Sequence, residues 1–245
     1  MIEKFLDPYE LKARIAPGLI LVLPLLADGI YAAPILSSWP IFAASGVCTL
    51  ALLYGLSLLV RAGGEGIEPT LWDSWGGPPS TRFMRHRDST FGAELKLSIQ
   101  STLAKMFSAR LLTPDAEAQD PDRADKAILD AFRHVRQYLR QHDPDGLWFK
   151  HDIEYGFCRN LLGCRVMWAV ISVCATFFAI AYAAKTGAGL LNPASGIGCL
   201  SLLCAAYVGW LVLPRATKRA GDAYAESAWM AFLRIAGEEK ARSSN

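Results

Sequence analysis

The sequence predicts an all-α membrane protein, in which four transmembrane helices form two hairpins and a mostly helical cytoplasmic domain is inserted between them. Two observations predict this class. Four apolar stretches are long enough to cross a bilayer, which takes about 20 helical residues, and Lys and Arg gather on one side of them. The composition agrees, because 52% of the 245 residues are hydrophobic and only 20% are charged.

The predicted spans are 15–36, 39–60, 166–184 and 194–213. They pair into a first hairpin over 15–60 and a second over 165–213, because only short turns join the members of each pair. Prolines interrupt the first span, which makes it the span most prone to a kink.

Basic residues near the ends of the spans predict the orientation. They lie before the first span, after the second, before the third and after the fourth: Lys4, Lys12, Arg14, Arg61, Arg159, Arg165, Arg215, Lys218 and Arg219. In the two turns on the opposite side, Lys185 is the only basic residue. Since positive charge favours the cytoplasmic side, the N-terminal segment 1–14, the central regulatory domain 61–164 and the C-terminal segment 214–245 are all predicted to be cytoplasmic.

Periodicity and turn residues predict the elements of the cytoplasmic segments. A glycine-rich turn is expected at 62–66, and 72–79 is too rich in Gly and Pro for a regular element. Helices are expected over 91–112, from a cap at Asp120 to about Gln141, from a turn at 143–146 into the third span, and, as an amphipathic helix, over 217–239.

Small residues recur every four positions in the last two spans, at Ala175, Ala179 and Ala183 and at Ser201, Ala205 and Gly209. Such stripes let helices approach closely in lipid. They predict close packing, either within the chain or between subunits.

The sequence carries no pattern that indicates catalysis. It has no nucleophile elbow, no zincin motif and no phosphate-binding loop, so the chain is predicted not to be an enzyme and to need no cofactor. One metal-binding alternative remains open, in which the ligands would be His142, His151, Asp152 and Glu154.

Cations and aromatic rings are densest around residues 72–88. Arg82, Arg85 and Arg87 follow Trp72 and Trp75. Guanidinium groups bind phosphates in a bidentate manner, and indole rings offer faces on which bases stack. This cluster is therefore predicted to bind a nucleotide or a short single strand. The alternative is that the arginines meet lipid headgroups or acidic partners.

Asp28 is the acidic residue within a predicted span. An ionisable group at this depth costs a few kcal/mol, so it usually faces a cavity or a pore, and acidic residues at such positions select cations. Asp28 is predicted to line a pore, with a position near the outer headgroups as the alternative.

Two blocks of sequence resemble a family of bacterial four-span membrane proteins of anti-phage defence. The blocks are Trp72-x-x-Trp75-Gly76-Gly77-x-Pro79-x-Thr81-x-x-x-Arg85-x-x-Asp88 and Glu154-Tyr155-Gly156-Phe157-x-Arg159-Asn160-Leu161-x-Gly163. Over most of its length the chain is similar to the channel component of Hailong-type systems. It departs at Cys158, where a basic residue is expected, and over 141–150.

The resemblance implies a homo-tetrameric ion channel in the bacterial inner membrane. It implies a nucleotidyltransferase partner whose product, a single-stranded oligodeoxyadenylate, binds the cytoplasmic domain and holds the channel shut. Arg159 joins the predicted ligand contacts, and Tyr155 and Asn160 are predicted to couple ligand binding to the third span. Two other functions stay open: a non-conducting membrane-anchored scaffold and a membrane enzyme.

Overall fold

The computed structural model describes residues 7–32, 46–187, 189 and 192–243, and within these residues the protein is all-α, with no strand. The described residues divide into two compact units. The first comprises Met1–Pro69 and Ile153–Thr217, and the second comprises Thr70–Asp152 and Lys218–Asn245. Residues 61–69 and 153–164 of the predicted cytoplasmic domain thus belong to the first unit.

Three helices of the described residues are long and apolar enough to cross a membrane: Glu10–Ile30, Arg165–Thr186 and Pro193–Glu239. They contain most of the first, third and fourth predicted spans, and they indicate a multi-pass membrane protein. The second predicted span falls partly outside the described residues, and its remainder belongs to a longer helix that begins at Gly46.

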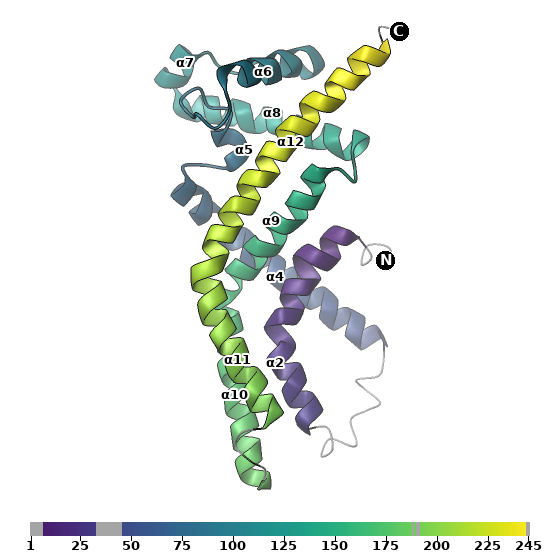
Figure 1. The fold of residues 1–245 in the computed structure, drawn as a ribbon, viewed down its shortest axis with the longest axis vertical. Coiled ribbons are helices and arrows are strands. Elements are labelled where there is room, and N and C mark those ends of the chain that lie inside the picture. The colour runs from purple at the N-terminus through teal and green to yellow at the C-terminus, as the bar shows by residue number, and fades with distance from the viewer. Residues whose placement is uncertain (1–6, 33–45, 188, 190–191, 244–245) are drawn as a thin grey trace. The chain divides into compact units, whose positions relative to one another are not determined.

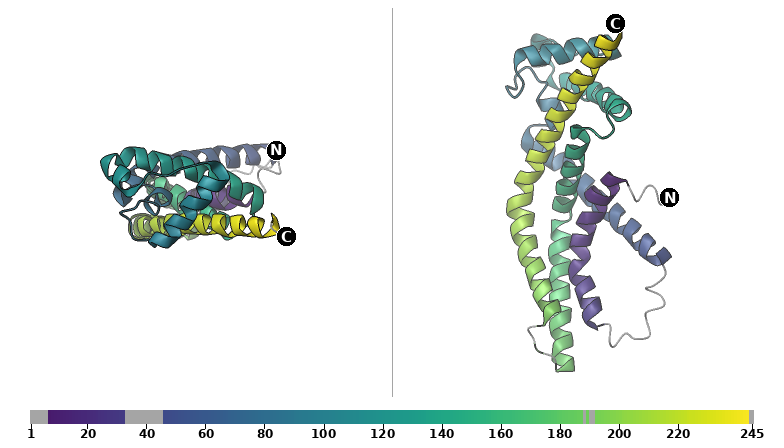
Figure 2. Two further views of the ribbon diagram at one scale, coloured as in Figure 1. Left: turned by 90° about the horizontal axis from the view of Figure 1, so that it is seen from above. Right: turned by 45° about the vertical axis from the view of Figure 1, so that its right-hand side comes forward.

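The first unit is built on a hairpin of α10 (Arg165–Thr186) and α11 (Pro193–Tyr207), which run side by side in Figures 1 and 2. The π-helical segment η1 (Glu10–Ile15) leads into α2 (Ala16–Ala32), which packs against both α10 and α11. The predicted small-residue stripes are buried within this unit, Ala179, Ala183 and Ala205 completely so. The stripes therefore serve packing within the chain.

Polar side chains join α10 to α11. The indole Nε1 of Trp168 donates to Ser201 Oγ at 2.9 Å, and the hydroxyls of Ser172 and Ser201 are also 2.9 Å apart. All three side chains are buried. A Cβ at Gly198 would lie 3.1 Å from the backbone of Thr176, so the glycine allows the two helices to approach closely.

The helix α4 (Gly46–Trp75) corrects two expectations from the sequence, because the predicted turn at 62–66 and residues 72–75 of the predicted irregular segment are both helical. Glycines lower helix propensity by about 1 kcal/mol each, but here two of them have a packing role. A side chain at Gly64 would collide with Asn160 of α9 (Leu147–Gly163), and a side chain at Gly163 would collide with the backbone of Gly63. The glycines give close backbone contact between α4 and α9, which outweighs their poor propensity.

The second unit contains α5 (Pro79–Arg82), α6 (Ala93–Phe107), α7 (Pro114–Gln119) and α8 (Pro121–His142). Together with the C-terminal part of α12 (Leu213–Ser243) they enclose an aromatic-rich core that includes Phe132, Trp148, Trp229 and Phe232. The predicted cap of α8 is confirmed, since Asp120 Oδ1 accepts from the backbone N–H of Arg123 at 3.0 Å.

No break separates the fourth span from the predicted amphipathic helix over 217–239. The π-helical segment η2 (Val208–Val212) connects α11 to α12, and the residues at both of its ends keep right-handed helical backbone angles. The backbone is therefore helical from Pro193 to Ser243.

Candidate functional site

Arg85, a predicted ligand contact, is buried in the second unit and paired with a carboxylate. Its Nε and Nη2 atoms donate to the two carboxylate oxygens of Asp125, at 2.7 and 2.5 Å, and Nη1 donates to the carbonyl of Gly76 at 2.5 Å. Only 8% of Arg85 is exposed. This bidentate pairing uses the geometry that would otherwise suit a phosphate.

Gly76 and Gly77 form a tight turn against this guanidinium. Gly76 and Gly77 have φ angles of 77° and 116°, a region that favours glycine. A Cβ at Gly77 would lie 2.6 Å from Nη2 of Arg85. Both glycines of the Trp-Gly-Gly block therefore have a structural role, which is to turn the chain tightly around Arg85.

Arg82 is held in a second ion-pair network. Its Nη2 lies 2.7 Å from Asp222 Oδ1, its Nη1 donates to the carbonyl of Trp75 at 3.1 Å, and its Nε lies 3.8 Å from Asp88 Oδ2. Burial alone would raise the pKa of Asp88, but hydrogen bonds from Thr90 and the nearby positive charges lower that pKa below its ordinary value. The network therefore keeps Asp88 charged and gives Arg82 two carboxylate partners.

The remaining predicted contacts of this cluster are more accessible. Arg87 is exposed, and Trp72 and Trp75 are half-buried. Of the five predicted contacts in this segment, Arg82 and Arg85 already have carboxylate partners within the second unit. Of the segment's three arginines, Arg87 is the one with an exposed side chain.

A second polar cluster lies in the first unit, where α9 crosses α4. Glu68 Oε1 accepts from Arg159 Nη1 at 2.9 Å and from the hydroxyl of Tyr155 at 2.8 Å. Asn160 Oδ1 accepts from Arg159 Nη2 at 3.2 Å, and Asn160 Nδ2 donates to the carbonyl of Ala13 at 2.7 Å. The structure therefore brings Tyr155, Arg159 and Asn160 together.

Glu68 is the residue of this cluster that the sequence did not identify. The sequence indicates Glu68 only indirectly. Arg159 lies shortly before the third predicted span and needs a carboxylate partner, and Glu68 lies shortly after the second predicted span. Burial alone would lower the pKa of Arg159, but the charge and hydrogen bond of Glu68 raise it. Arg159 is therefore held as a permanent cation within the protein.

Cys158, where the resemblance predicts a basic residue, is buried in the first unit. The thiol is 8% exposed, and burial, with a smaller effect from Glu154, raises its pKa to about 11. Cys158 is therefore a neutral thiol near pH 7, and the position carries no charge that could contact an anionic ligand.

Asp28 lies in α2, four residues after Pro24. It is 4% exposed, and both of its carboxylate oxygens are buried without a hydrogen-bond partner among the described residues. Buried carboxylates are normally paired or hydrogen-bonded. In a candidate membrane helix, a carboxylate without a partner among the described residues usually faces the interior of a helix bundle or a water-filled cavity.

The alternative metal site is not assembled. In the parts of the chain that the structure describes, no group of three or more His, Cys, Asp or Glu side chains could hold a metal ion. His142 instead lies 3.5 Å from Glu239, and its Nδ1 lies 2.8 Å from the carbonyl of Tyr138. Its surroundings are those of a residue at a helix end.

No family model, curated protein or solved structure matches the chain. The functional assignment therefore rests on its own residues and their geometry. Three features stand out: Asp28 without a partner among the described residues, the Glu68 network between α4 and α9, and the arginines Arg133, Arg136 and Arg140 of α8, which line a hollow.

Proposed function

We propose that this chain is a subunit of an oligomeric membrane channel of bacterial anti-phage defence, held closed by a nucleotide or oligodeoxyadenylate bound to its cytoplasmic part. Release of the ligand opens the pore and depolarises the cell. The three candidate membrane helices and the resemblance of the two sequence blocks to Hailong-type channels support this proposal. The observation that carries it is Asp28.

A buried carboxylate without a partner is costly in a bilayer, by about 2.5–3.5 kcal/mol at the centre of a helix on insertion scales. Such a residue is retained when it meets water or ions in the assembled protein. In a ring of subunits, Asp28 would line the pore and favour cations. Pro24, in the same helix, removes one backbone hydrogen bond and loosens the wall of that pore.

The network around Glu68 is the proposed coupling element. It fixes α9 against α4 and η1, and only Cys164 separates the end of α9 from the start of α10. A ligand shifts a conformational equilibrium only by the difference in its affinity for the two states. Tyr155, Arg159 and Asn160 would convert that difference into a movement of α10.

The proposed assembly is a homo-tetramer in the inner membrane, with both termini inside the cell. Its partners would be the bilayer, the oligonucleotide ligand and the nucleotidyltransferase that makes it. The basic residues that flank the apolar spans support this orientation.

Ion flux through purified protein in liposomes tests the proposal. We expect cation flux that oligodeoxyadenylate reduces, and a strong loss of cation selectivity in Asp28→Asn. Asp73→Asn, which neutralises an exposed carboxylate outside the spans, is the control and should conduct as the unmodified protein does. Absence of flux, with and without ligand, would overturn the channel proposal and leave a membrane-anchored scaffold.

A further inference from the structure

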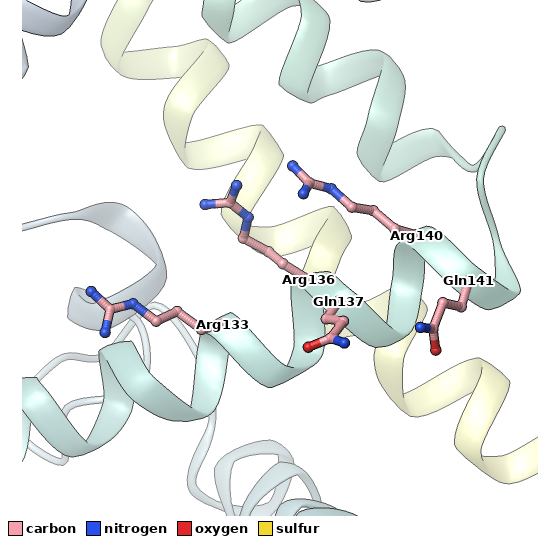
Figure 3. Close-up of a pocket in the computed structure, with 5 residues that line it drawn as sticks. All are labelled: Arg133, Arg136, Gln137, Arg140 and Gln141. Carbon is pink, nitrogen blue, oxygen red and sulfur yellow. The ribbon is translucent and has the colours of Figure 1, made fainter.

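Three arginines form a row on α8 that the preceding sites do not use. Arg133, Arg136 and Arg140 extend from the same side of the helix, as Figure 3 shows, and with Gln137 and Gln141 they line an open hollow. Spacings of three and four residues place side chains on one helical face. At 1.5 Å per residue the row covers about 10 Å of the helix axis.

The charges of this row are largely unopposed. Arg133 pairs with Asp130 at 2.8 Å, but both side chains are about two-thirds exposed, and such surface pairs contribute about 0–1 kcal/mol. Within the described residues Arg136 and Arg140 have no ion pair. Arg82 and Arg85 contrast with them, since each is held by a carboxylate of its own unit.

The opposite face of α8 indicates whether the arginine row binds a membrane surface or a soluble anion. Its apolar residues, among them Ile128, Phe132 and Val135, are buried in the core of the second unit, and none of its large apolar side chains is exposed. A helix that binds a membrane surface inserts apolar side chains between the lipids. Because α8 has none available, a soluble anion fits it better than a bilayer does.

We propose that this row binds the phosphates of a single-stranded nucleic acid. Guanidinium groups bind phosphates through paired hydrogen bonds, and a linear row of cations matches a linear polyanion. The two glutamines add amide groups beside the phosphate contacts. This inference rests on the proposed function, because it places the regulatory strand on α8. The sequence analysis predicted other ligand contacts: Arg82, Arg85, Arg87, Trp72, Trp75 and Arg159.

Fluorescence anisotropy tests this inference, with the full chain in detergent and a short fluorescein-labelled oligodeoxyadenylate as the probe. The test variant is Arg133→Gln/Arg136→Gln/Arg140→Gln. The control, Arg110→Gln/Arg123→Gln/Lys126→Gln, removes the same charge from exposed positions of the same unit. We expect the test variant to bind at least about tenfold more weakly and its salt slope to fall by about 2, since each contact to a single strand contributes about 0.7.

The placement on α8 is wrong if the unmodified chain does not bind the strand, or if the test variant binds it as tightly as the unmodified chain does. It is also wrong if the test and control variants lose equal affinity, or if the test variant loses binding to anionic phosphatidylglycerol vesicles but keeps its binding to the strand. Flux in liposomes separates this failure from that of the proposed function. If the strand closes the unmodified channel and the test variant equally, the channel proposal stands and the site on α8 is wrong. If the test variant conducts but no longer responds to the strand, both stand.

Discussion

The side chain of Asn160 occupies the space that a Cβ at Gly64 would fill. A methyl group at Gly64 would collide with the carboxamide oxygen of Asn160 and would lie 2.9 Å from its Cα. Asn160 is completely buried and is hydrogen-bonded to Ala13, so it has no room to withdraw.

Gly64→Ala should therefore lower the stability of the protein by about 1–3 kcal/mol, the usual cost of overpacking. Thermal unfolding in detergent would measure it as a lower Tm. Gly66→Ala is a matched control in the same helix, because nothing lies within 4 Å of the new Cβ. That control should gain about 0.5–1 kcal/mol from the better helix propensity of alanine. Equal Tm values for the two variants would contradict the close contact between α4 and α9.

Glu68 and Arg159 should be energetically coupled. Their side chains are 17% and 12% exposed and 2.9 Å apart, and a partly buried pair interacts more strongly than one in water. A double-mutant cycle with Glu68→Gln and Arg159→Gln should give a coupling energy of about 1 kcal/mol or more. The exposed pair Arg61–Glu65, 2.6 Å apart in the same helix, is the control and should give about 0.3–0.5 kcal/mol. A cycle no larger than this control would exclude the network as a structural element.

Arg85→Ala should destabilise the second unit by about 1–3 kcal/mol, because it leaves Asp125 and the carbonyl of Gly76 without their donor. Chemical denaturation would measure the loss. Arg87→Ala changes an exposed side chain in the same segment and should shift stability by no more than about 0.5 kcal/mol. Measured together with strand binding, the two variants separate roles: unchanged stability and abolished binding in Arg85→Ala would restore Arg85 as a ligand contact.

Because the Cys158 thiol is buried, we expect the folded protein to lose stability at alkaline pH. In the folded chain its pKa is about 11, against 9.0 for an ordinary thiol. Below pH 9 both states hold the proton, so the stability is unaffected. Between about pH 9 and 11 only the unfolded thiol loses its proton, and the free energy of unfolding falls by on the order of 2 kcal/mol. Unfolding measured across this window should show a smaller fall in Cys158→Ala; identical profiles would contradict the burial of the thiol.

Local patterns were sufficient to predict much of the helical architecture. The cap and proline at 120–121 define the start of α8, and three of the four predicted spans correspond to helices that are long and apolar enough to cross a membrane. The turn predicted at 62–66 failed because the glycines of a turn and those of a close helix crossing look alike in one sequence. Only the partner at Gly163, a hundred residues away in sequence, distinguishes the two.

The candidate sites show the same limit. Arginines at 82–87 are conspicuous in the sequence, but their carboxylates are not, because Asp125 lies 40 residues from Arg85 and Asp222 lies 140 residues from Arg82. Charge pairing over such separations depends on the fold. The three arginines of α8 are visible in the sequence, but only the structure shows that Arg136 and Arg140 have no ion pair among the described residues.

The crossing of α4 and α9 also restricts how this protein can change in length. Gly64 and Glu68 lie four residues apart on one face, where the first admits Asn160 and the second receives Arg159. Inserting or deleting one residue between them would rotate the rest of α4 by about 100°, so one contact or the other would be lost. Homologous chains should therefore vary freely in residue type on the outer face of α4, but they should keep the number of residues between these two positions.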